Sequence, residues 1–374
     1  EAMGFLAQAQ TLSPRGGLQA GPSLRFDNLP DTESSAVRLR IQGAVLEPLE
    51  IMAIATLLER AADVQQTLAP LAAAFPRLAG YAEQIGDFRA ALRSIAGKIL
   101  PDGTLDDHAS VALARIRRDL ERQKRTIHES LERFLKQHRD DGLLQEEFVT
   151  IRNDRFVVPV VPSAKKKAPG VVHGASGSGQ TLFIEPLETI ELNNDLVRLT
   201  DEELRESHRI LAEMTERLRE HAGEIQAAAA ALASLDAIFA RAHFALETGA
   251  VVPVLSPDEA PVLNLKNARH PLLDDLFRRQ RKQVVPFTLT LDGPLRTLLI
   301  SGPNTGGKTV TMKTVGAFAL MAQSGWPVPA AEATLPVFAD VLADIGDNQS
   351  IEHSLSSFSA HVARIGEMVE AAQS

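Results

Sequence analysis

Apolar residues recur every seven positions in two long, otherwise polar stretches of the chain. The first stretch opens at Thr104, with Asp107 as a weak capping-box partner, and its repeating positions are Leu113, Leu120, Ile127 and Phe134. The second runs from about Glu191 to Glu247, and its repeating positions are Leu204, Leu211, Leu218, Ile225, Leu232 and Phe239. A seven-residue repeat places one apolar seam along a helix and favours near-parallel packing. Each stretch is therefore predicted to be a long helix.

The two helices are predicted to form an antiparallel arm, roughly 50 Å long at a rise of 1.5 Å per residue. An ordinary buried bundle is the alternative. The arm is favoured because residues 147–186, which separate the helices, have strand character. This segment contains β-branched runs broken by Pro and Gly, namely FVTI, RFVVPVV, GVVHGAS and TLFIEP. The sequence therefore predicts a small β-rich tip at the end of the arm.

The predicted tip is basic, although the chain as a whole is acidic. Asp154 is the only acid between residues 151 and 182, so this stretch carries +4 on a chain of −9. A basic β-module is suited to contact a phosphate backbone, and the candidate residues are Lys165, Lys166, Lys167, Arg152 and Arg155. A solvated lysine loop is the alternative. The glycine-rich run GASGSGQT is interpreted as a turn, because no Lys follows its glycines.

The remaining segments differ from the arm in their pattern of apolar residues. Residues 44–100 are rich in Ala and Leu with helical periodicity, and Pro stands at the joints. After Gly249, the runs VVPVL, PVLNLK, FTLTL and TLLIS predict strands that alternate with helix, as in an α/β domain. The predicted architecture is multidomain, α and α/β. Its five parts are a helical core (1–103), an arm helix (104–146), the basic tip (147–186), a returning arm helix (187–248) and an α/β domain (249–374).

Composition narrows the possible classes of function. The chain has 374 residues, of which 44% are hydrophobic and 23% charged, typical of a soluble protein with more than one core. It has no cysteine, which excludes a disulfide scaffold, a thiol nucleophile and thiolate metal sites and suits a reducing, cytoplasmic compartment. No apolar run approaches the roughly 18 residues of a membrane span, so no membrane partner is predicted. Because the chain has an acidic net charge, a nucleic acid is expected to bind only at a local basic patch.

The clearest chemical motif fits G-x-x-x-x-G-K-[ST] and consists of Gly302, Pro303, Asn304, Thr305, Gly306, Gly307, Lys308 and Thr309. A short strand at residues 298–300 is predicted before it, and a helix after it. Glycines let backbone N–H groups turn toward phosphate oxygens, and the helix N-terminus adds partial positive charge. Lys308 is predicted to reach the β- and γ-phosphates, and the Thr309 hydroxyl to bind Mg²⁺. The expected ligands are therefore ATP or ADP with Mg²⁺.

A P-loop ATPase also needs an acidic residue that holds Mg²⁺ and positions water. No run of aliphatic residues followed by Asp-Glu occurs after the motif. From the residues alone, either Asp344, within VLADIGDNQS, has this role or the catalytic acid lies beyond Ser374.

Several stretches together resemble the MutS ATPases, and in particular the bacterial MutS-two subfamily, which lacks a mismatch-reading domain. Three of them are GPNTGGKT, the upstream Ala268-Arg269-His270-Pro271-Leu272-Leu273 and the downstream Leu355-Ser356-Ser357-Phe358. The run from RFVVPVV to GVVHGASGSGQTLFIEPLETIELNNDL resembles the subfamily's helix–strand junction. The resemblance covers roughly residues 90–370 and is specific over 145–195 and 298–360. His270, in the RHP junction, is interpreted as structural.

The resemblance implies a fold and an assembly. MutS-type proteins are dimers of a helical core and lever, a clamp that embraces nucleic acid, and an ABC-like ATPase domain. By resemblance, the arm and tip match the lever and clamp, and residues 249–374 match a P-loop ATPase domain that is incomplete at its C-terminus. The family's Asp-Glu pair follows its signature-like serine, so the catalytic acid is expected beyond Ser374.

The resemblance also suggests residues around the nucleotide. Ser356 matches the signature-like serine that reaches the nucleotide of the opposing subunit, so a homodimer would share each site. In mismatch-repair relatives an aromatic residue stacks on adenine, whereas the nearest match here is Val284 and Val285, with Phe287 displaced. The resemblance therefore implies that adenine is contacted by these two valines or by Phe287 from another angle.

Three functions follow from the resemblance. The subfamily is associated with suppression of homologous recombination through branched DNA, and the full-length protein carries an endonuclease domain elsewhere. It is also associated with the rescue of collided ribosomes, which makes the ribosome and rRNA the alternative partner. The third possibility is a nucleotide-binding structural module without turnover. This chain is expected to bind ATP or ADP but to hydrolyse it poorly.

Overall fold

The computed structural model describes residues 1–11, 24–292, 297–303, 306–345 and 354–371. The chain divides into two compact units, each a mixture of helix and other structure. Unit 1 comprises residues 1–23, 71–78 and 233–374, and unit 2 comprises residues 24–70 and 79–232. A multidomain α and α/β organisation is confirmed, whereas the finer five-part division stays a prediction.

Short helices and one long helix form the N-terminal part of unit 2. They are α2 (Glu33–Leu39), α3 (Pro48–Leu68) and α5 (Arg89–Ile95), while α4 (Pro76–Ala82) crosses the division between the units and α1 (Ala2–Thr11) belongs to unit 1. Helix α3 begins at Pro48, because proline favours the first turn and the Glu47 N–H donates to the Glu50 carboxylate at 2.8 Å. Its buried residues recur every three or four positions, from Ile51 to Leu68.

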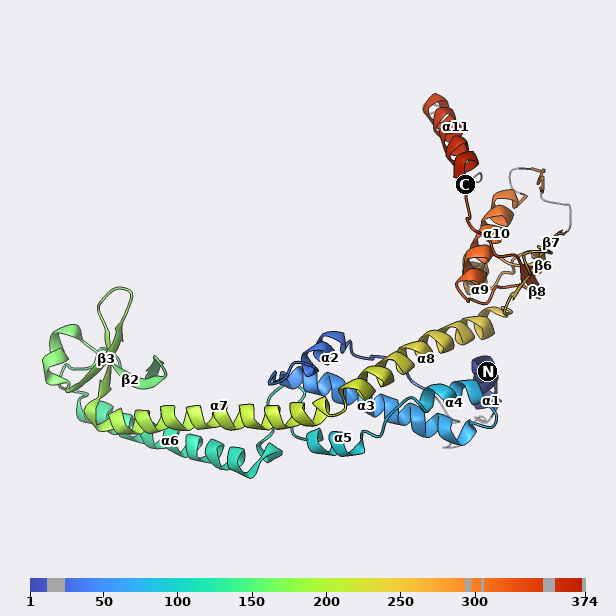
Figure 1. Cartoon of the computed structure of the whole chain (residues 1–374). Helices are drawn as coiled ribbons and strands as arrows, with labels where there is room; N and C mark the ends of the chain where they lie inside the picture. The colour runs from blue at the N-terminus through green and yellow to red at the C-terminus, as the bar shows by residue number, and fades with distance from the viewer. Residues whose placement is uncertain (12–23, 293–296, 304–305, 346–353, 372–374) are drawn as a thin grey trace. The chain divides into compact units, whose positions relative to one another are not determined.

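Helices α6 (Val111–Gln137) and α7 (Ile190–Arg219) lie side by side and antiparallel, and we call this pair the arm (Figure 1). The first helix begins at Val111 and not at Thr104, because Ser110 caps it by accepting the Leu113 N–H at 2.9 Å. A short 3-10 turn, Asp107–Ala109, precedes this cap. Across the arm, Arg117 Nε donates to Glu203 Oε1 at 2.7 Å.

The predicted helix from Glu191 to Glu247 is two helices in the structure. Helix α7 ends at Arg219, and α8 (Ala222–Thr248) begins after a tight turn in which the His221 N–H donates to the Leu218 carbonyl at 3.0 Å. The Arg219 guanidinium binds the Leu39 and Ala44 carbonyls at 2.8 and 2.5 Å. The seven-residue repeat passes through the break because Leu218 and Ile225 are both fully buried.

Leu204 does not lie in the apolar seam that the repeat predicts, since 70% of its surface is exposed. A straight α-helix has 3.6 residues per turn, so positions seven apart drift by about 20° per repeat. Leu218 is buried, Leu211 is half-buried and Leu204 has rotated into solvent. The buried face of α7 instead follows Leu196, Ile210, Met214 and Leu218.

The tip is a four-stranded antiparallel sheet, as the strand character of residues 147–186 predicts. Its strands are β1 (Thr150–Arg152), β2 (Arg155–Val160), β3 (Gly170–Ala175) and β4 (Leu182–Pro186), in the order β1-β2-β4-β3. A 3-10 helix, η3 (Pro162–Lys167), connects β2 to β3, and another, η4 (Leu187–Thr189), leads into α7. The GASGSGQT run is the turn between β3 and β4, with the Ser176 N–H donating to the Thr181 carbonyl at 2.8 Å.

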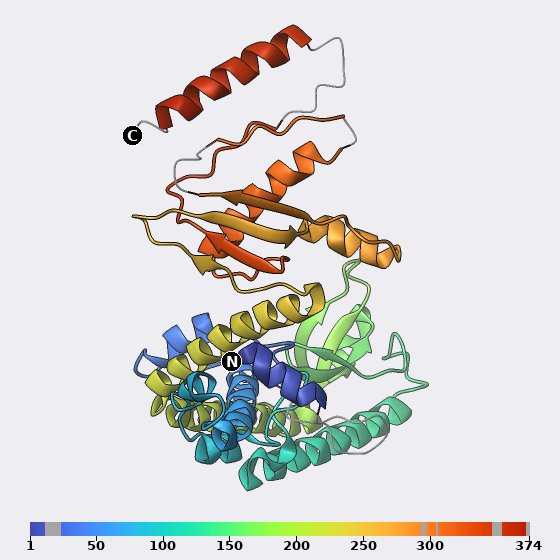
Figure 2. The same ribbon diagram turned by 90° about the vertical axis from the view of Figure 1, so that its right-hand side faces the viewer.

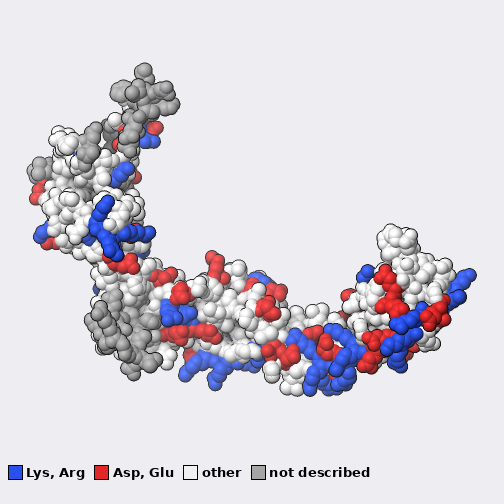
Figure 3. Space-filling view, turned by 180° about the vertical axis from the view of Figure 1, so that it is seen from behind, with Lys and Arg blue, Asp and Glu red and all other residues white. Residues whose placement is uncertain are grey.

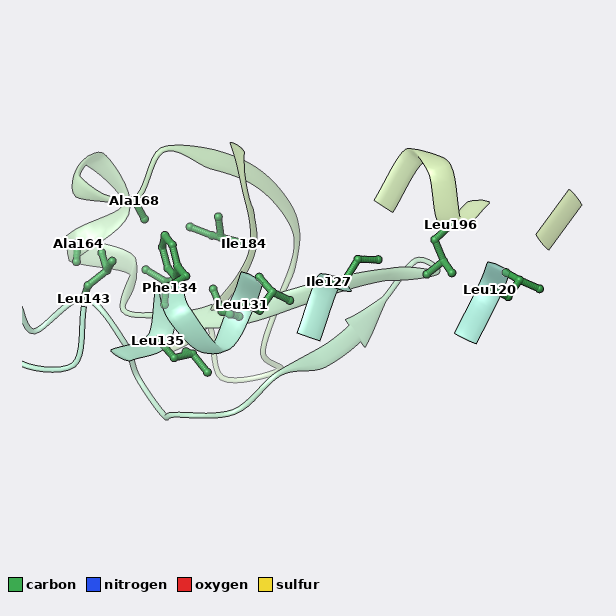
Figure 4. Close-up of a cluster of buried hydrophobic side chains, with 12 residues drawn as sticks. Leu120, Ile127, Leu131, Phe134, Leu135, Leu143, Ala164, Ala168, Ile184 and Leu196 are labelled. Atoms are coloured by element: carbon green, nitrogen blue, oxygen red, sulfur yellow. The ribbon is translucent and has the colours of Figure 1, made fainter. Parts of the chain in front are cut away.

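One hydrophobic cluster joins the tip to the arm (Figure 4). It contains Leu131 and Phe134 from α6, Leu196 from α7 and Ile184 from β4, together with Ala164 and Ala168, which flank the lysines of η3. Asn193, which is fully buried in the first turn of α7, holds the backbone of Phe156 on β2 from both sides. Its Oδ1 accepts the Phe156 N–H at 3.0 Å, and its Nδ2 donates to the Phe156 carbonyl at 3.1 Å.

Unit 1 contains a four-stranded sheet with one helix packed on its face (Figure 2). The strands β5 (Val254–Leu255), β6 (Leu263–Ala268), β7 (Phe287–Leu291) and β8 (Glu332–Leu335) take the order β5-β8-β6-β7, and only the β5–β8 pair is parallel. Helix α10 (Lys308–Gln323) packs Phe318 and Ala319 against Leu265 of β6. Helices α9 (Pro271–Arg279) and α11 (Ser354–Ala371) complete the described elements.

The strand predicted at residues 298–300 is not formed. Residues 297–301 have no strand assignment, and Leu298 and Leu299 are 46% and 89% exposed. A strand is stabilised by a hydrogen-bonded neighbour, and among the described residues no ladder includes this segment. The apolar pattern was therefore insufficient for a strand. The other three predicted strands of this region correspond to β5, β6 and β7.

Helix α8 is long and apolar enough to cross a membrane, unlike any segment that the sequence analysis identified. A core helix of a soluble protein passes the same test. Its buried side chains recur every three or four residues, and most of the residues between them are exposed or half-buried. The buried apolar ones are Ile225, Ala228, Ala231, Leu232, Leu235, Phe239, Ala242 and Ala245. This one-sided burial is typical of a helix packed on a protein core.

Replacing Asn193 with Ala should loosen the tip from the arm. The Asn193→Ala change leaves the N–H and carbonyl of Phe156 without their partners, which is expected to cost about 2–3 kcal/mol. Urea unfolding followed by circular dichroism measures this loss, and faster hydrogen exchange at Phe156 locates it. Asn194→Ala is the matched control, because Asn194 is exposed and accepts one bond from Arg155. Equal stability of the two variants would contradict the role of Asn193.

Candidate nucleotide-binding and nucleic-acid-binding sites

The glycine-rich motif forms a loop that ends at the N-terminus of α10. Gly302 has φ of 147° and Gly307 has φ of 82°, which are conformations that residues with a Cβ rarely adopt. The Gly306 N–H donates to the Pro303 carbonyl at 3.0 Å and tightens the loop. Asn304 and Thr305 lie outside the described residues. Gly307 is the N-cap of α10, so the N–H groups of the helix's first turn lie next to the loop.

Lys308 lies across this loop. Its Nζ donates to the Gly302 carbonyl at 2.5 Å and to the Pro303 carbonyl at 2.8 Å. The loop therefore positions one ammonium group beside the first turn of a sixteen-residue helix. An ammonium group and helix N–H groups that converge on one loop are suited to bind an anion such as phosphate.

The other predicted nucleotide contacts lie in separate elements. Thr309, the second residue of α10, is exposed, so its hydroxyl is accessible for a metal ion. Val284 and Val285 lie in the segment between α9 and β7, and Val285 is 89% exposed. Phe287, the displaced aromatic residue, instead packs on the core of unit 1. Ser356 lies in the first turn of α11, and its side chain is outside the described residues.

Asp344, one of the two alternatives for the catalytic acid, does not follow a strand. Residues 340–345 have no strand assignment, although the sequence suggests a strand-like approach. One carboxylate oxygen of Asp344 lies 3.6 Å from Nη1 of Arg364 on α11. Asp347 is outside the described residues. In the described part of the chain, no group of three or more His, Asp or Glu side chains is arranged to hold a metal ion.

The RHP junction connects the sheet of unit 1 to the end of α8. Arg269 Nη2 donates to the Thr248 carbonyl at 2.5 Å, and Arg278 Nη1 donates to the Glu247 carbonyl at 2.7 Å. Both guanidinium groups therefore cap the C-terminus of α8, where helix carbonyls lack partners and the helix dipole favours cations. Asp274, at 3.4 and 3.6 Å, lies between the two arginines and keeps them oriented.

His270 lies beside the helix that follows the loop. Its Nδ1 is buried and has no hydrogen-bond partner among the described residues. Burial lowers the pKa of His270, and the charge of Lys313 on α10 lowers it further. The imidazole is therefore held neutral at physiological pH, which fits the structural role that the sequence suggests.

Lys165, Lys166 and Lys167 are exposed on η3 of the tip. Buried Ala164 and Ala168 flank them and anchor η3 in the cluster that joins tip and arm. Three ammonium groups therefore project from a short helix that is fixed at both ends. Arg152 is also exposed, and its guanidinium lies 4.3 Å above the ring centroid of Phe183.

Arg155 differs from the other four basic residues of the tip. Its Nη1 lies 3.0 Å from Oε1 of Glu185, whose side chain is only 2% exposed, and its Nη2 donates to Asn194 Oδ1 at 2.7 Å. His173 Nε2 lies 2.6 Å from the other Glu185 oxygen. A buried carboxylate requires charged or hydrogen-bonded partners. This geometry favours a structural role for Arg155 over the phosphate contact that the sequence suggests.

The structure thus reveals a polar network that the sequence analysis missed. The net charge of +4 predicted for the tip covers residues 151–182. It therefore does not include Glu185, which neutralises Arg155. One signal was present in the sequence: Glu185 stands within the apolar run TLFIEP, and a continuous apolar run is typical of a strand that is buried on both faces. Asn193, by contrast, had no distinguishing pattern, because an asparagine at a helix start is typical of a cap.

The chain is similar to a known protein family and to several curated proteins. Residues 298–374 match the family model described as MutS domain V. Similar curated proteins are named Endonuclease MutS2. The Pelotomaculum thermopropionicum protein is 42% identical over 329 residues, which are 88% of this chain and 41% of the relative. The Geobacillus sp. protein is 40% identical over 339 residues, which are 90% of this chain and 42% of the relative. This chain therefore spans about two-fifths of the length of these relatives.

The stability of the protein should depend on pH through His270. Its pKa is lowered by folding, so the unfolded chain binds a proton more readily. Stability is then full above about pH 6.5 and falls as the pH decreases toward the folded pKa. His270→Gln should lose less stability than the wild type between about pH 7.5 and about pH 5 in thermal melts. His128→Gln, at an exposed histidine of α6, is the control. An unchanged pH dependence in His270→Gln would exclude this role.

Proposed function

Because the chain belongs to the MutS2 subfamily of the MutS proteins, we propose that it binds ATP or ADP with Mg²⁺ as part of a MutS-type ATPase acting on nucleic acid. The observation that supports this most directly is the loop of residues 302–309. It places the Lys308 ammonium group beside the N-terminus of α10.

The residues of the loop fit a nucleotide's phosphates. Phosphate oxygens are stronger partners for an ammonium group than the two backbone carbonyls that Lys308 contacts now, because the resulting hydrogen bonds join opposite charges. The N–H groups of the first turn of α10 supply further donors. Thr309 offers a hydroxyl to Mg²⁺, which in P-loop proteins bridges the β- and γ-phosphates.

The arm and tip are proposed to be the lever and clamp of this protein. The exposed lysines of η3 support a contact with a phosphate backbone, and Arg152 extends it. We propose branched DNA as the substrate and a homodimer as the assembly, in which Ser356 reaches the partner's nucleotide and Val284 and Val285 lie near adenine. The cytoplasm is the proposed compartment. An endonuclease activity is proposed only for the full-length protein.

Removing the Lys308 ammonium group should weaken nucleotide binding. For Lys308→Ala we expect the Kd for ADP with Mg²⁺ to rise by about 10- to 100-fold, which is the value of a charge-assisted hydrogen bond. Isothermal titration calorimetry measures the change. Lys313→Ala, on the same helix and with the same loss of charge, is the control. If the two variants bind ADP with equal affinity, the loop is not part of the nucleotide site.

Hydrolysis by this chain alone is expected to be slow, because no Asp-Glu pair follows an aliphatic run after the loop. Phosphate release from ATP measures turnover. Rapid turnover that Lys308→Ala abolishes would show that the catalytic acid lies within the chain, with Asp344 as the candidate to replace.

Replacing Lys165, Lys166 and Lys167 together with Ala should weaken binding to DNA and flatten its salt dependence. Each lost phosphate contact is expected to change the slope of log Kd against log salt by about one. Fluorescence anisotropy at several salt concentrations measures both quantities. A triple variant of the acidic helix α7, with Arg198, Arg205 and Arg217 replaced, loses the same charge and is the control.

The same assay distinguishes the proposed substrates. A four-way junction should bind more tightly than a linear duplex of equal length if branched DNA is the substrate. Co-sedimentation with ribosomes in place of junction binding would support the ribosome as the partner. If the salt slope is unchanged in the lysine variant, the tip lysines form a solvated loop and do not contact DNA phosphates.

A further inference from the structure

Four arginines form a row along one face of α6, and we call this row the arginine face. Its members are Arg115, Arg118, Arg122 and Arg125. Their spacing of three and four residues places them on one side of the helix. All four are exposed. Figure 3 shows the Lys and Arg side chains gathered along the lower edge of the arm.

The arginine face lies opposite the packed side of α6. The buried residues Leu113, Leu120 and Ile127 interleave with the arginines in sequence but lie about half a turn away at 100° per residue. The guanidinium groups therefore point away from the core that holds the arm together. Packing does not explain why four arginines occupy these positions.

The arginine face is only partly neutralised. Arg115 and Arg122 share Asp119, at 3.8 and 3.3 Å. Arg118 and Arg125 donate to carbonyls of their own helix, Ala114 and Glu121, at 3.1 and 3.4 Å. In the described part of the chain, neither has a salt bridge to a carboxylate. Glu121 lies close enough to Arg125 to attract it, but its salt bridge is with Lys124, so among the described residues neither Arg118 nor Arg125 has a paired counter-charge of its own.

The two helices of the arm differ in charge. Helix α6 has eight Lys and Arg and four Asp and Glu, whereas α7 has five Arg and eight Asp and Glu. Three exposed arginines of α7 are paired within their helix. Arg198 contacts Asp195 and Glu202, Arg209 contacts Glu206 and Glu213, and Arg217 contacts Glu213. Arg205 is exposed and has no salt bridge among the described residues. An ordinary solvated helix surface has mixed charges, as α7 does. The excess on α6 is concentrated on one face.

We propose that the arginine face binds the phosphate backbone of a nucleic-acid duplex and continues the contact made by the tip. The inference rests on the proposed function, because it assumes that the chain acts on nucleic acid. Arg115 and Arg125 are ten residues apart, so the face is about 15 Å long. Duplex DNA carries one negative charge per about 1.7 Å of its axis, so several phosphates lie along this length.

The arginine face and the tip lysines are parts of one packed structure. Phe134 and Leu135, near the end of α6, share a cluster with Ala164 and Ala168, which flank the lysines. Arg133 and Lys136 continue the basic row beyond Glu129 toward that end of the helix. A duplex held at the tip can therefore follow α6, and the contact would not depend on base sequence because guanidinium groups would bind phosphates alone.

The test compares two double variants of the whole chain. Arg118→Gln with Arg125→Gln removes the two arginines that lack salt bridges, and Gln preserves helix propensity. Arg198→Gln with Arg205→Gln removes the same charge from α7 and is the control. Binding to a fluorescent DNA duplex and to an RNA duplex is measured by anisotropy over a range of salt concentrations.

For the arginine-face variant we expect the Kd to rise by about 3- to 30-fold and the salt slope to fall by about two, whereas the control should retain the wild-type slope. A larger effect with DNA than with RNA would assign the backbone to DNA, and the reverse to RNA. If the arginine-face variant behaves like the control while the tip lysine variant loses affinity, the inference is wrong and the proposed tip contact remains. A loss of self-association without a change in DNA or RNA binding would show that the face binds another copy of the chain, which would overturn it. If the wild-type chain binds neither duplex, the inference and the proposed nucleic-acid contact both fail, whereas nucleotide binding is tested separately through Lys308.

Discussion

The tip depends on the hydrophobic cluster that it shares with the arm. A segment of about forty residues is too small to bury a sufficient core of its own, and an isolated small sheet is marginally stable in water. Here Val158, Val160 and Ile184 of the sheet pack against Leu131 and Phe134 of α6. The ends of the two arm helices thus supply the missing half of the core. The basic residues of the tip therefore depend on this shared core for a stable position at the end of the arm.

Buried polar side chains fix the orientation of the tip sheet on the arm helices, which the apolar cluster alone would leave free. Apolar contacts have little directionality, so they alone would permit the sheet to rotate on the helices. The side chain of Asn193 bonds both the N–H and the carbonyl of Phe156, as a neighbouring strand would. The Glu185 carboxylate contacts Arg155 with one oxygen and His173 with the other. Buried polar groups without partners are costly, which restricts the tip to the one arrangement that satisfies them. This network therefore fixes how the tip, with its lysines, is oriented on the ends of the arm helices.

In unit 1, the packing of α10 positions the end of the glycine-rich loop that leads into this helix. Phe318, Ala319 and Ala322 attach this helix to the sheet, so its N-terminus and Lys308 are held by a rigid element. The RHP junction adds a second connection, because Arg269 and Arg278 cap α8 from the neighbourhood of the same sheet. His270, whose pKa burial lowers, is also near enough to Lys313 on α10 for that charge to lower it further.

Much of this organisation could be predicted from the residues, and the failures have physical causes. The loop motif, the two-helix arm and the strands of the tip depend on local patterns, namely fixed glycine spacing, seven-residue periodicity and β-branched runs, and they were identified. The break at residue 220 was not, because apolar positions on both sides of it keep the same spacing. Leu204 was placed in the seam because a seven-residue repeat ignores the drift of a straight helix. The strand at 298–300 failed because a strand requires a partner that no local pattern specifies.

The sequence by itself determined the helices of the arm, the strands of the tip, the place of the glycine-rich loop and the excess of arginine in α6. These properties depend on residues close together in the chain. Only the tertiary structure decided that Arg155 neutralises a buried carboxylate and that Asn193 completes the backbone bonding of β2. It also decided that Arg118 and Arg125 have no salt bridge among the described residues. Charge pairing and burial depend on which distant residues meet, and a linear count of charges does not contain that information.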